Sequence, residues 1–303
     1  MKSNGRFKST RENGLDKNHV MFHLWQKSKK LGIWNPNDID FSRDIEDWKS
    51  FDESQREFIL HVGSLFLAGE EAVTLDLLPL IKVTAEEGRL EEEMYLASFL
   101  WEEAKHVDFF RRFLDVVIGD QGDLSRFHTE NYKDLFYKAL PEAMSRLYAD
   151  TSPEAQVEAS VTYNMIIEGM LAETGYYGFY QALEKNNFLP GMMEGITLVQ
   201  RDESRHMRFG IYFISRLVAV HGESVWQVVE SKMSELLTPA IGLINDLFDE
   251  HEAKFGEIPF GLDREDYVEY GMTQFQKRMN RIEKARNQTL DEIIHRRSEE
   301  FAT

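Results

Sequence analysis

Two short stretches, Glu103-Ala-Lys-His106 and Glu203-Ser-Arg-His206, decide the fold of this 303-residue chain. In each stretch a Glu and a His lie three residues apart, so on a helix both side chains leave one face and can reach the same ion. A lone Glu in an apolar helical segment precedes each motif. Glu70 lies 33 residues before Glu103, and Glu168 lies 35 residues before Glu203. Each interval suits one helical hairpin, so the chain has two similar halves.

The two halves together supply four carboxylates and two imidazoles from four helices, which is the ligand set of a carboxylate-bridged pair of metal ions. Converging buried carboxylates are costly unless cations compensate them. We therefore predict an all-α, ferritin-like helical bundle with a four-helix di-metal core and peripheral helices, and dioxygen chemistry at that core. The alternative is two surface ion-pair faces on ordinary helices. The predicted metal ligands are Glu70, Glu103, His106, Glu168, Glu203 and His206.

The donor atoms favour particular ions. Oxygen and nitrogen ligands without sulfur are typical of iron and manganese sites. Both a di-iron pair and a mixed manganese/iron pair fit this residue set. A third Glu-x-x-His match, Glu292 to His295, is expected by chance in a chain with 53 Asp and Glu residues, because no lone Glu pairs with it.

Helical spacing predicts where several neighbours of the predicted ligands lie relative to the site. Glu71 competes with Glu70, but adjacent side chains point about 100° apart, so only one of them fits the site. Val73 shares the face of Glu70 and is expected close to the metals. Tyr163 precedes Glu168 by five residues, and a π-turn would align the two. Without that turn, Tyr163 is a core tyrosine.

Two acidic residues are candidates for a supporting role around the ligands. Asp202 is expected to accept a hydrogen bond from the outer nitrogen of a metal-bound His. Glu173 is expected at the helix surface. Small residues on the Glu168 helix either leave room for a substrate or allow close helix packing, and both interpretations stay open. They are Gly169, Ala172, Gly175 and Gly178.

Composition excludes several classes of protein. The net charge of −18 argues against nucleic acid as a partner. The chain has no Cys, hence no disulfide and no thiolate ligand. We recognise no signal peptide and no apolar run that approaches a membrane span, and expect a cytoplasmic protein. Basic clusters at Lys2–Lys17 and Lys277–Arg297 are expected to be solvated, with peripheral contact to an anionic membrane as the alternative.

Breaks in the apolar helical periodicity separate the expected helices. Together these helices predict one all-α domain over residues 1–303, with a flexible arm at 1–17 and a metal-bearing core at about 54–220. Asp52 or Ser54 is expected to cap a helix that Pro79 ends, and Ser152-Pro153 to begin another. The expected helices are 19–30, 54–78, 89–118, 131–148, 153–185, 190–221, 222–256 and 263–298.

Beyond these patterns, the chain resembles the small, metal-bearing subunit of ribonucleotide reductase and, more closely, the branch called ligand-binding oxidases. The resemblance runs from about Trp25 to Arg216. It rests on Trp34-Asn-Pro-x-Asp-Ile-Asp-Phe-Ser-Arg-Asp44, Gly69-Glu-Glu-Ala-Val73, the Glu-Glu-Ala-Lys-His stretch ending at His106, the helix with Tyr163 and Glu168, and Asp202-Glu-x-x-His206.

The resemblance implies the same six ligands with a mixed manganese/iron cofactor. It also implies an ether cross-link between the Val73 side chain and the Tyr163 phenol oxygen, made with dioxygen. A long-chain fatty acid or similar lipid-like ligand at the metals and a homodimer are further implications. Trp34, Asp202 and His106 match the electron-transfer route of the reductase subunit. The sequence identifies neither the electron donor nor the substrate.

Two departures favour the oxidase branch over a radical-generating reductase subunit. Phe110 stands four residues after His106, where many reductase subunits carry the radical tyrosine. No Tyr follows Tyr270 to pass a radical to a large partner subunit. The alternative functions are the reductase small subunit, an iron store, and a metal-dependent lipid-binding protein without turnover.

Overall fold

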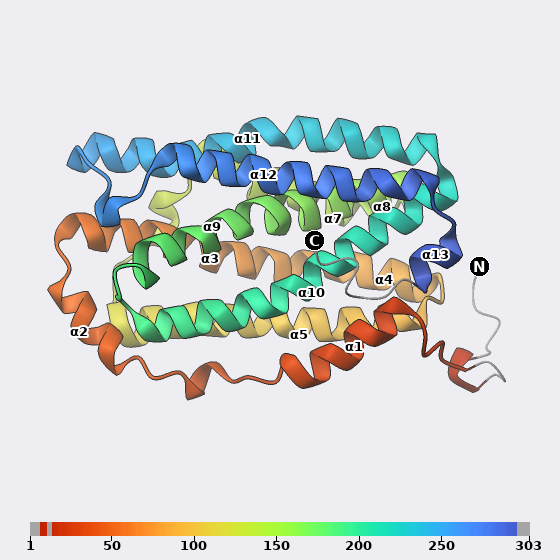
Figure 1. Ribbon diagram of the computed structural model, residues 1–303, viewed down its shortest axis with the longest axis horizontal. Helices are drawn as coiled ribbons and strands as arrows, with labels where there is room; N and C mark the ends of the chain where they lie inside the picture. Colours follow the sequence, from red (N-terminus) through yellow and green to blue (C-terminus); the bar gives the residue numbers. More distant parts are fainter. Residues whose placement is uncertain (1–6, 11–13, 296–303) are drawn as a thin grey trace.

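The computed structural model describes residues 7–10 and 14–295. Within those residues the secondary structure is helical and contains no strand, which confirms the predicted all-α, ferritin-like bundle (Figure 1). The α-helices are α1 Val20–Leu31, α2 Ser42–Ser50, α3 Glu53–Asp76, α4 Leu78–Glu86, α5 Leu90–Phe113, α6 Glu130–Lys133, α7 Leu140–Arg146, α8 Pro153–Ser160, α9 Glu173–Phe179, α10 Pro190–His221, α11 Glu223–Phe255, α12 Arg264–Glu283 and α13 Leu290–Ile294.

Several stretches of the described chain are π-helical, and the longest of them lies at the centre of the bundle. Between α8 and α9, residues Val161–Ala172 form a π-helical segment of 12 residues. This segment, called the π segment below, joins α8 and α9 into one long helix (Figure 1). The sequence led us to consider a single π-turn here, and the structure extends it to the whole segment.

The core helices begin where the sequence caps them. Asp52 accepts a hydrogen bond from the Gln55 amide, and the Gln55 side chain accepts one from the Asp52 amide, which completes a capping box before α3. Ser152 caps α8, with Pro153 in the first turn. These caps fix the start of two of the helices that carry the site.

Four helical elements enclose the centre of the molecule. α3 packs against α5, and the π segment contacts α10, α11 and α12. Figure 1 shows α11 and α12 running side by side along one side of the bundle and α5 on the opposite side, with α10 crossing obliquely between them. The faces of α3, α5, the π segment and α10 that meet at the centre hold the predicted metal ligands.

The helices of the structure differ from the predicted ones in three places. α2 was not predicted. The helix predicted to end at Pro79 does end just before it, at Asp76, but α4 was not predicted: Pro79 lies in its first turn, where the missing N–H costs no hydrogen bond. The single helix predicted over 263–298 is wrong: α12 ends at Glu283, and Thr289 starts α13 with a capping box to Glu292. Residues 296–298 lie outside the described residues.

The described parts of the predicted N-terminal arm contact the bundle. Lys8 forms an ion pair with the buried Glu91 of α5. The Asp16 amide donates to the same carboxylate at 2.8 Å, and the Asp16 carboxylate lies 3.0 Å from His295. These contacts connect both ends of the described chain to one region of the bundle.

One part of the chain is apolar enough to span a membrane by length and composition. A window within Glu53–Glu86 has a mean hydropathy of 1.4, so the expectation that no run approaches this threshold was wrong. In the structure 56% of that window is buried inside the bundle. The core helix of a water-soluble bundle meets the same criterion, so this is weak evidence for a membrane span.

Candidate metal centre

All six predicted ligands converge at the centre of the bundle. α3 contributes Glu70, the π segment Glu168, and α5 and α10 one Glu-x-x-His pair each. Their donor atoms form two groups in which all atoms lie within 4.8 Å of one another. The first group is Glu70, Glu103, His106 and Glu203, and the second is Glu103, Glu168, Glu203 and His206. Because Glu103 and Glu203 belong to both groups, they are placed to bridge two ions.

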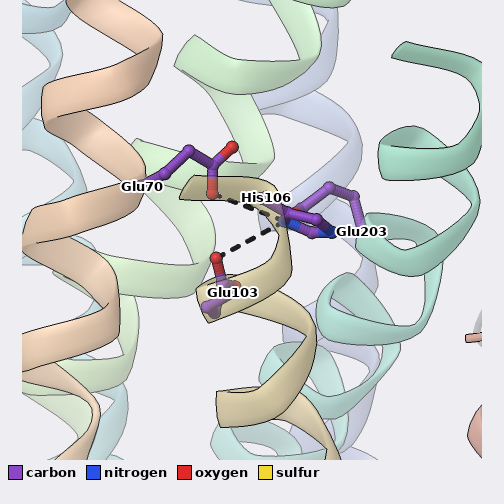
Figure 2. Close-up of side chains that lie close together, drawn as sticks. All are labelled: Glu70, Glu103, His106 and Glu203. Carbon is purple, nitrogen blue, oxygen red and sulfur yellow. Dashed lines mark ion pairs between the residues drawn. The ribbon is translucent and has the colours of Figure 1, made fainter. Parts of the chain in front are cut away.

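The side chains of the first group face one another across three helices. Figure 2 shows Glu70 on α3 turned toward His106 and Glu103 of α5, with Glu203 of α10 beside the imidazole. Nδ1 of His106 lies 3.4 Å from Glu70 Oε2 and 3.4 Å from Glu203 Oε1. In the second group, Nδ1 of His206 lies 3.0 Å from Glu103 Oε1. Both imidazoles therefore point the same ring nitrogen at the carboxylates.

The donor set fits a pair of divalent cations. Glu103 Oε2, Glu168 Oε1, Glu203 Oε2 and Nδ1 of both histidines are buried and have no hydrogen-bond partner. Unsatisfied buried polar atoms are costly and rare. Four carboxylates would balance two divalent charges, and neutral imidazoles would supply the remaining donors. A metal pair would thus satisfy every one of these atoms.

A second layer of acidic residues orients the two histidines. Nε2 of His106 lies 3.4 Å from Asp202 Oδ2, as predicted for Asp202. Nε2 of His206 lies 2.9 Å from Glu102 Oε2, an interaction we did not predict. Each acid comes directly before the Glu of one motif and contacts the His of the other. The shared pattern of acid, Glu, two residues and His was the signal that could have revealed Glu102.

Two buried cations neutralise these outer acids. Arg205 pairs with Glu102 at 2.6 Å and with Asp202 at 2.5 Å. Lys105 pairs with Asp202 at 2.7 Å. The outer layer therefore carries balanced charge, and the uncompensated negative charge of the centre stays on the four inner glutamates.

The protonation of the inner groups reflects burial and mutual repulsion. Burial raises the pKa of Glu70 to about 8, and burial followed by the neighbouring Glu203 raises the pKa of Glu168 well above its usual range. Burial alone would lower the pKa of His206, but Glu203 and Glu103 raise it well above its ordinary value. Without metal, protons thus take the place of cations, and metal binding must displace them.

Tyr163 and Val73 both lie beside the inner carboxylates. The Tyr163 hydroxyl is fully buried and donates a hydrogen bond to Glu103 Oε1 at 3.2 Å. Asn164, the next residue of the π segment, donates to Glu168 Oε2 at 2.9 Å. Val73 is buried on α3 and lines a cavity together with Glu70. Tyr163 therefore contacts an inner carboxylate directly, and Val73 lies in the cavity wall that includes Glu70.

That cavity has a volume of about 120 Å³ and leads away from the carboxylates. Its wall is almost entirely apolar and comes from α3, the π segment, α9, α11 and α12. Ala172, Gly175 and Gly178 line it, whereas Gly169 does not. A Cβ on Gly169 would lie 2.8 Å from the Asn164 carbonyl oxygen, so this glycine serves close packing. A Cβ on Gly175 would also clash with the Phe66 ring, and one on Gly178 would lie 2.8 Å from Tyr267 Oη, so all three glycines serve close packing and two of them line the cavity as well.

Trp34 reaches the centre through Asp202. Its indole Nε1 donates to Asp202 Oδ2 at 2.8 Å, and its ring stacks on His106 with centroids 6.2 Å apart. The structure therefore connects Trp34, Asp202 and His106 in the order that the reductase resemblance implied.

The remaining candidates lie outside the centre. Glu71 is exposed. Glu173 was expected at the helix surface, but its side chain is only 16% exposed and lies 4.0 Å from the half-buried Arg278. Glu292 belongs to the capping box of α13, and His295 pairs with Asp291 at 2.9 Å. Phe110 is buried and stacks on Phe66.

Comparison with known proteins places this geometry in a family. The sequence profile described as "Ribonucleotide reductase, small chain" matches residues 17–294. This chain belongs to the ribonucleotide reductase small chain family. Within that family, it is similar to solved structures of an R2-like ligand-binding oxidase.

Two of these structures illustrate the likeness. A Tyr-to-Phe variant of the oxidase, with an anaerobically reconstituted Mn/Fe cofactor, is 42% identical and has a TM-score of 0.85. A Val-to-Ile variant, also with Mn/Fe, is 42% identical and has a TM-score of 0.86. In both, the match covers 92% of this chain and 98% of the other. These relatives carry Mn/Fe, and the buried Glu/His cluster of this chain can bind metal.

Proposed function

We propose that this protein is a dioxygen-dependent di-metal oxidase of the ligand-binding type. Glu70, Glu103, His106, Glu168, Glu203 and His206 would hold a mixed manganese/iron pair, with a di-iron pair as the alternative. When bound, the metals would supply the reduction of dioxygen and, with it, the oxidising power for a C–H bond. The observation that carries the proposal is the convergence of these six side chains, with the Tyr163 hydroxyl hydrogen-bonded to one of them, Glu103.

The self-processing reaction we propose joins these two residues. The Val73 side chain loses one hydrogen at Cβ, the Tyr163 hydroxyl loses another, and a C–O bond forms between them. Two electrons leave in this step, and dioxygen takes them up. The Tyr163 hydroxyl already donates to Glu103, so its proton has an acceptor at 3.2 Å. Burial raises the pKa of Tyr163 well above its usual value, so the phenol stays protonated until that carboxylate receives its proton.

The apolar cavity suggests the class of external ligand. Its wall presents hydrocarbon side chains along most of its length and carboxylates at one end. Such a site is complementary to a molecule with an apolar chain and one group that binds metal. We propose a long-chain fatty acid or a similar lipid-like molecule. The protein's contribution is to exclude water and to orient the chain toward the oxidising centre.

The reductase small subunit remains the second candidate, because the family match includes it. That function needs a radical and a large partner subunit. Phe110 is buried among aromatic rings and has no hydroxyl to carry such a radical. The Val73 and Tyr163 positions favour the oxidase.

Mass spectrometry of digested protein tests the proposal. Metal-free protein is loaded with manganese and iron in air and compared with an unloaded sample. We expect a linked peptide pair containing Val73 and Tyr163 that has lost two hydrogens. Tyr163→Phe should bind metals without forming the link, whereas Tyr176→Phe, a second buried tyrosine that lines the cavity, should still form it. Unlinked peptides from fully loaded, oxygen-exposed protein would refute the oxidase proposal.

Extraction of the purified protein tests the ligand. We expect organic solvent to release a long-chain carboxylic acid in an amount comparable to that of the protein. Leu247→Trp should reduce this amount, because the larger ring fills the cavity that Leu247 lines. Recovery of no apolar acid from metal-loaded protein would exclude the proposed ligand.

A further inference from the structure

One buried lysine lies against two tryptophans. Nζ of Lys105 is 4.4 Å from the ring centroid of Trp34 and 4.5 Å from that of Trp101. The Lys105 side chain is only 5% exposed, whereas Trp101 is 51% exposed. The two indoles therefore share one cation, and one of them opens to solvent. Trp101 takes no part in the function proposed above.

Lys105 is held firmly in this position. Its ammonium donates to the Gly32 carbonyl oxygen at 2.7 Å and pairs with Asp202 Oδ2 at 2.7 Å. The same Asp202 oxygen accepts the Trp34 hydrogen bond and lies 3.4 Å from His106 Nε2. A continuous set of contacts thus runs from a predicted metal ligand through Asp202 to Trp34, Lys105 and the exposed Trp101.

A fixed cation changes how easily an aromatic ring gives up an electron. A neutral indole is stabilised by an ammonium over its face. An indole that has lost an electron carries a positive charge, and Coulomb repulsion at this distance opposes that state, most strongly where water is excluded. Trp25 offers a contrast, because the Lys29 ammonium over its ring is exposed to water and therefore screened.

We propose that Lys105 is a positioning residue that suppresses one-electron oxidation of Trp34 and Trp101. Its charge disfavours electron transfer from these two indoles to the metal site, so the site does not lose its oxidising equivalents to tryptophans that reach the protein surface. In the suppressed step, an indole gives one electron to the metal site, which is reduced by that electron. The indole N–H proton then passes to the Asp202 carboxylate from Trp34, or to water from Trp101. The benefit of Lys105 to the protein rests on the proposed oxidase function, whereas the effect of its charge on the oxidation of the two indoles does not.

Metal-free protein tests the charge effect by itself. The full chain is exposed to a photochemically generated one-electron oxidant in air, and oxygen-containing tryptophan products are mapped by peptide mass spectrometry. Lys105→Met removes the charge but keeps the length of the side chain. We expect oxidation of Trp34 and Trp101 to rise at least about threefold, while Trp48 and Trp226 stay unchanged as internal references.

Two further variants separate charge from packing. Lys105→Arg keeps the charge and should behave like the unmodified protein. Lys29→Met removes an exposed cation and should change the oxidation of Trp25 only slightly. The inference is overturned if Lys105→Met leaves Trp34 and Trp101 at their original level, or if Lys105→Arg raises them as much as Lys105→Met does.

Metal-loaded protein tests directly whether the metal site oxidises these two tryptophans. After loading with manganese and iron in air, with no added oxidant, Lys105→Met should accumulate oxidised Trp34 and Trp101, and the unmodified protein should not. No accumulation in a fully loaded variant, together with a normal Val73–Tyr163 link in the unmodified protein, would contradict the inference. Absence of the Val73–Tyr163 link in the unmodified protein would instead contradict the proposed function, so the two failures are distinguishable.

Discussion

At the scale of single residues, the six inner ligands are not equivalent. Glu103 lies in both donor groups and Glu70 in only one. Glu103→Gln should therefore weaken both metal positions, whereas Glu70→Gln should leave one ion bound. Glu71→Gln is the matched control, because Glu71 is the exposed neighbour and should change nothing. Elemental analysis after loading and desalting measures the metals per chain. Equal losses in Glu70→Gln and Glu103→Gln would contradict the bridging assignment.

Glu102 should contribute to metal affinity although it is not one of the six inner ligands. It accepts from His206 and pairs with the buried Arg205. Because partners behind a metal-binding His fix its orientation, Glu102→Gln should weaken metal binding about 10- to 100-fold. Competition with a chelator of known affinity measures this. Asp108→Asn, an exposed change on the same helix, should have no effect. Unchanged affinity in Glu102→Gln would rule out the supporting role.

The buried acids also predict how pH affects the metal-free protein. Glu70 has a pKa of about 8 in the folded state against 4.5 as its ordinary value, so the folded state holds a proton that the unfolded chain has released. Stability should therefore fall as pH rises from 6.5 to about 8. Buried His61, with its pKa lowered by burial to about 4, acts in the opposite direction but only below 6.5.

Urea unfolding at several pH values measures this slope. Glu70→Gln should make the slope shallower, because the amide does not titrate, while Glu168 and His206, whose pKa values are also raised, still contribute to it. Metal loading should also remove it, because cations replace the protons. A metal-free protein that gains stability over this pH interval would show that Glu70 does not hold its proton.

At the scale of secondary-structure elements, the π segment sets the geometry of the site. In a regular helix, the side chains of residues five apart diverge. Here the Tyr163 hydroxyl donates to Glu103, and Glu168 belongs to the same donor group as Glu103. Gly169 allows the tight packing of this segment, since a Cβ there would lie 2.8 Å from the Asn164 oxygen and 3.1 Å from Met207 Sδ.

Alanine at this glycine tests the packing of the π segment. Gly169→Ala should destabilise the protein by about 1–3 kcal/mol through overpacking. It should also weaken metal binding, because Asn164 donates to Glu168. Gly63→Ala is the control on α3: no atom lies within 4 Å of its added Cβ, so about 0.5–1 kcal/mol of stabilisation is expected. Denaturant unfolding measures both. Unchanged stability in Gly169→Ala would show that the segment tolerates a side chain there.

Helix boundaries were predictable where a local signal decides them. Asp52, Ser152 and Pro190 mark their helices correctly, because capping and proline act within a few residues. Pro79 correctly marked the end of α3, but α4 was missed, because a residue that cannot continue one helix can start another. The break before Thr289 was missed in a highly charged segment that lacks apolar periodicity.

At the scale of the whole molecule, the sequence was informative because the site repeats. Two Glu-x-x-His motifs at similar offsets from lone Glu residues implied four helices around one centre, and the structure brings all six side chains together. Glu102 was missed although it precedes Glu103 as Asp202 precedes Glu203, a repeat that the sequence already contains. The cavity was not predictable in detail, because its wall combines residues as distant as Phe58 and Tyr267, which only the folded chain brings together.

The most direct test of the central claim is a crystal structure of metal-loaded protein with anomalous diffraction recorded at the manganese and iron absorption edges. We predict two peaks, one in each donor group, with Glu103 and Glu203 between them and one histidine Nδ1 on each ion. A mixed pair would give one peak that responds at the manganese edge and one at the iron edge. A single peak, or peaks away from Glu70, Glu168 and the two histidines, would contradict the account.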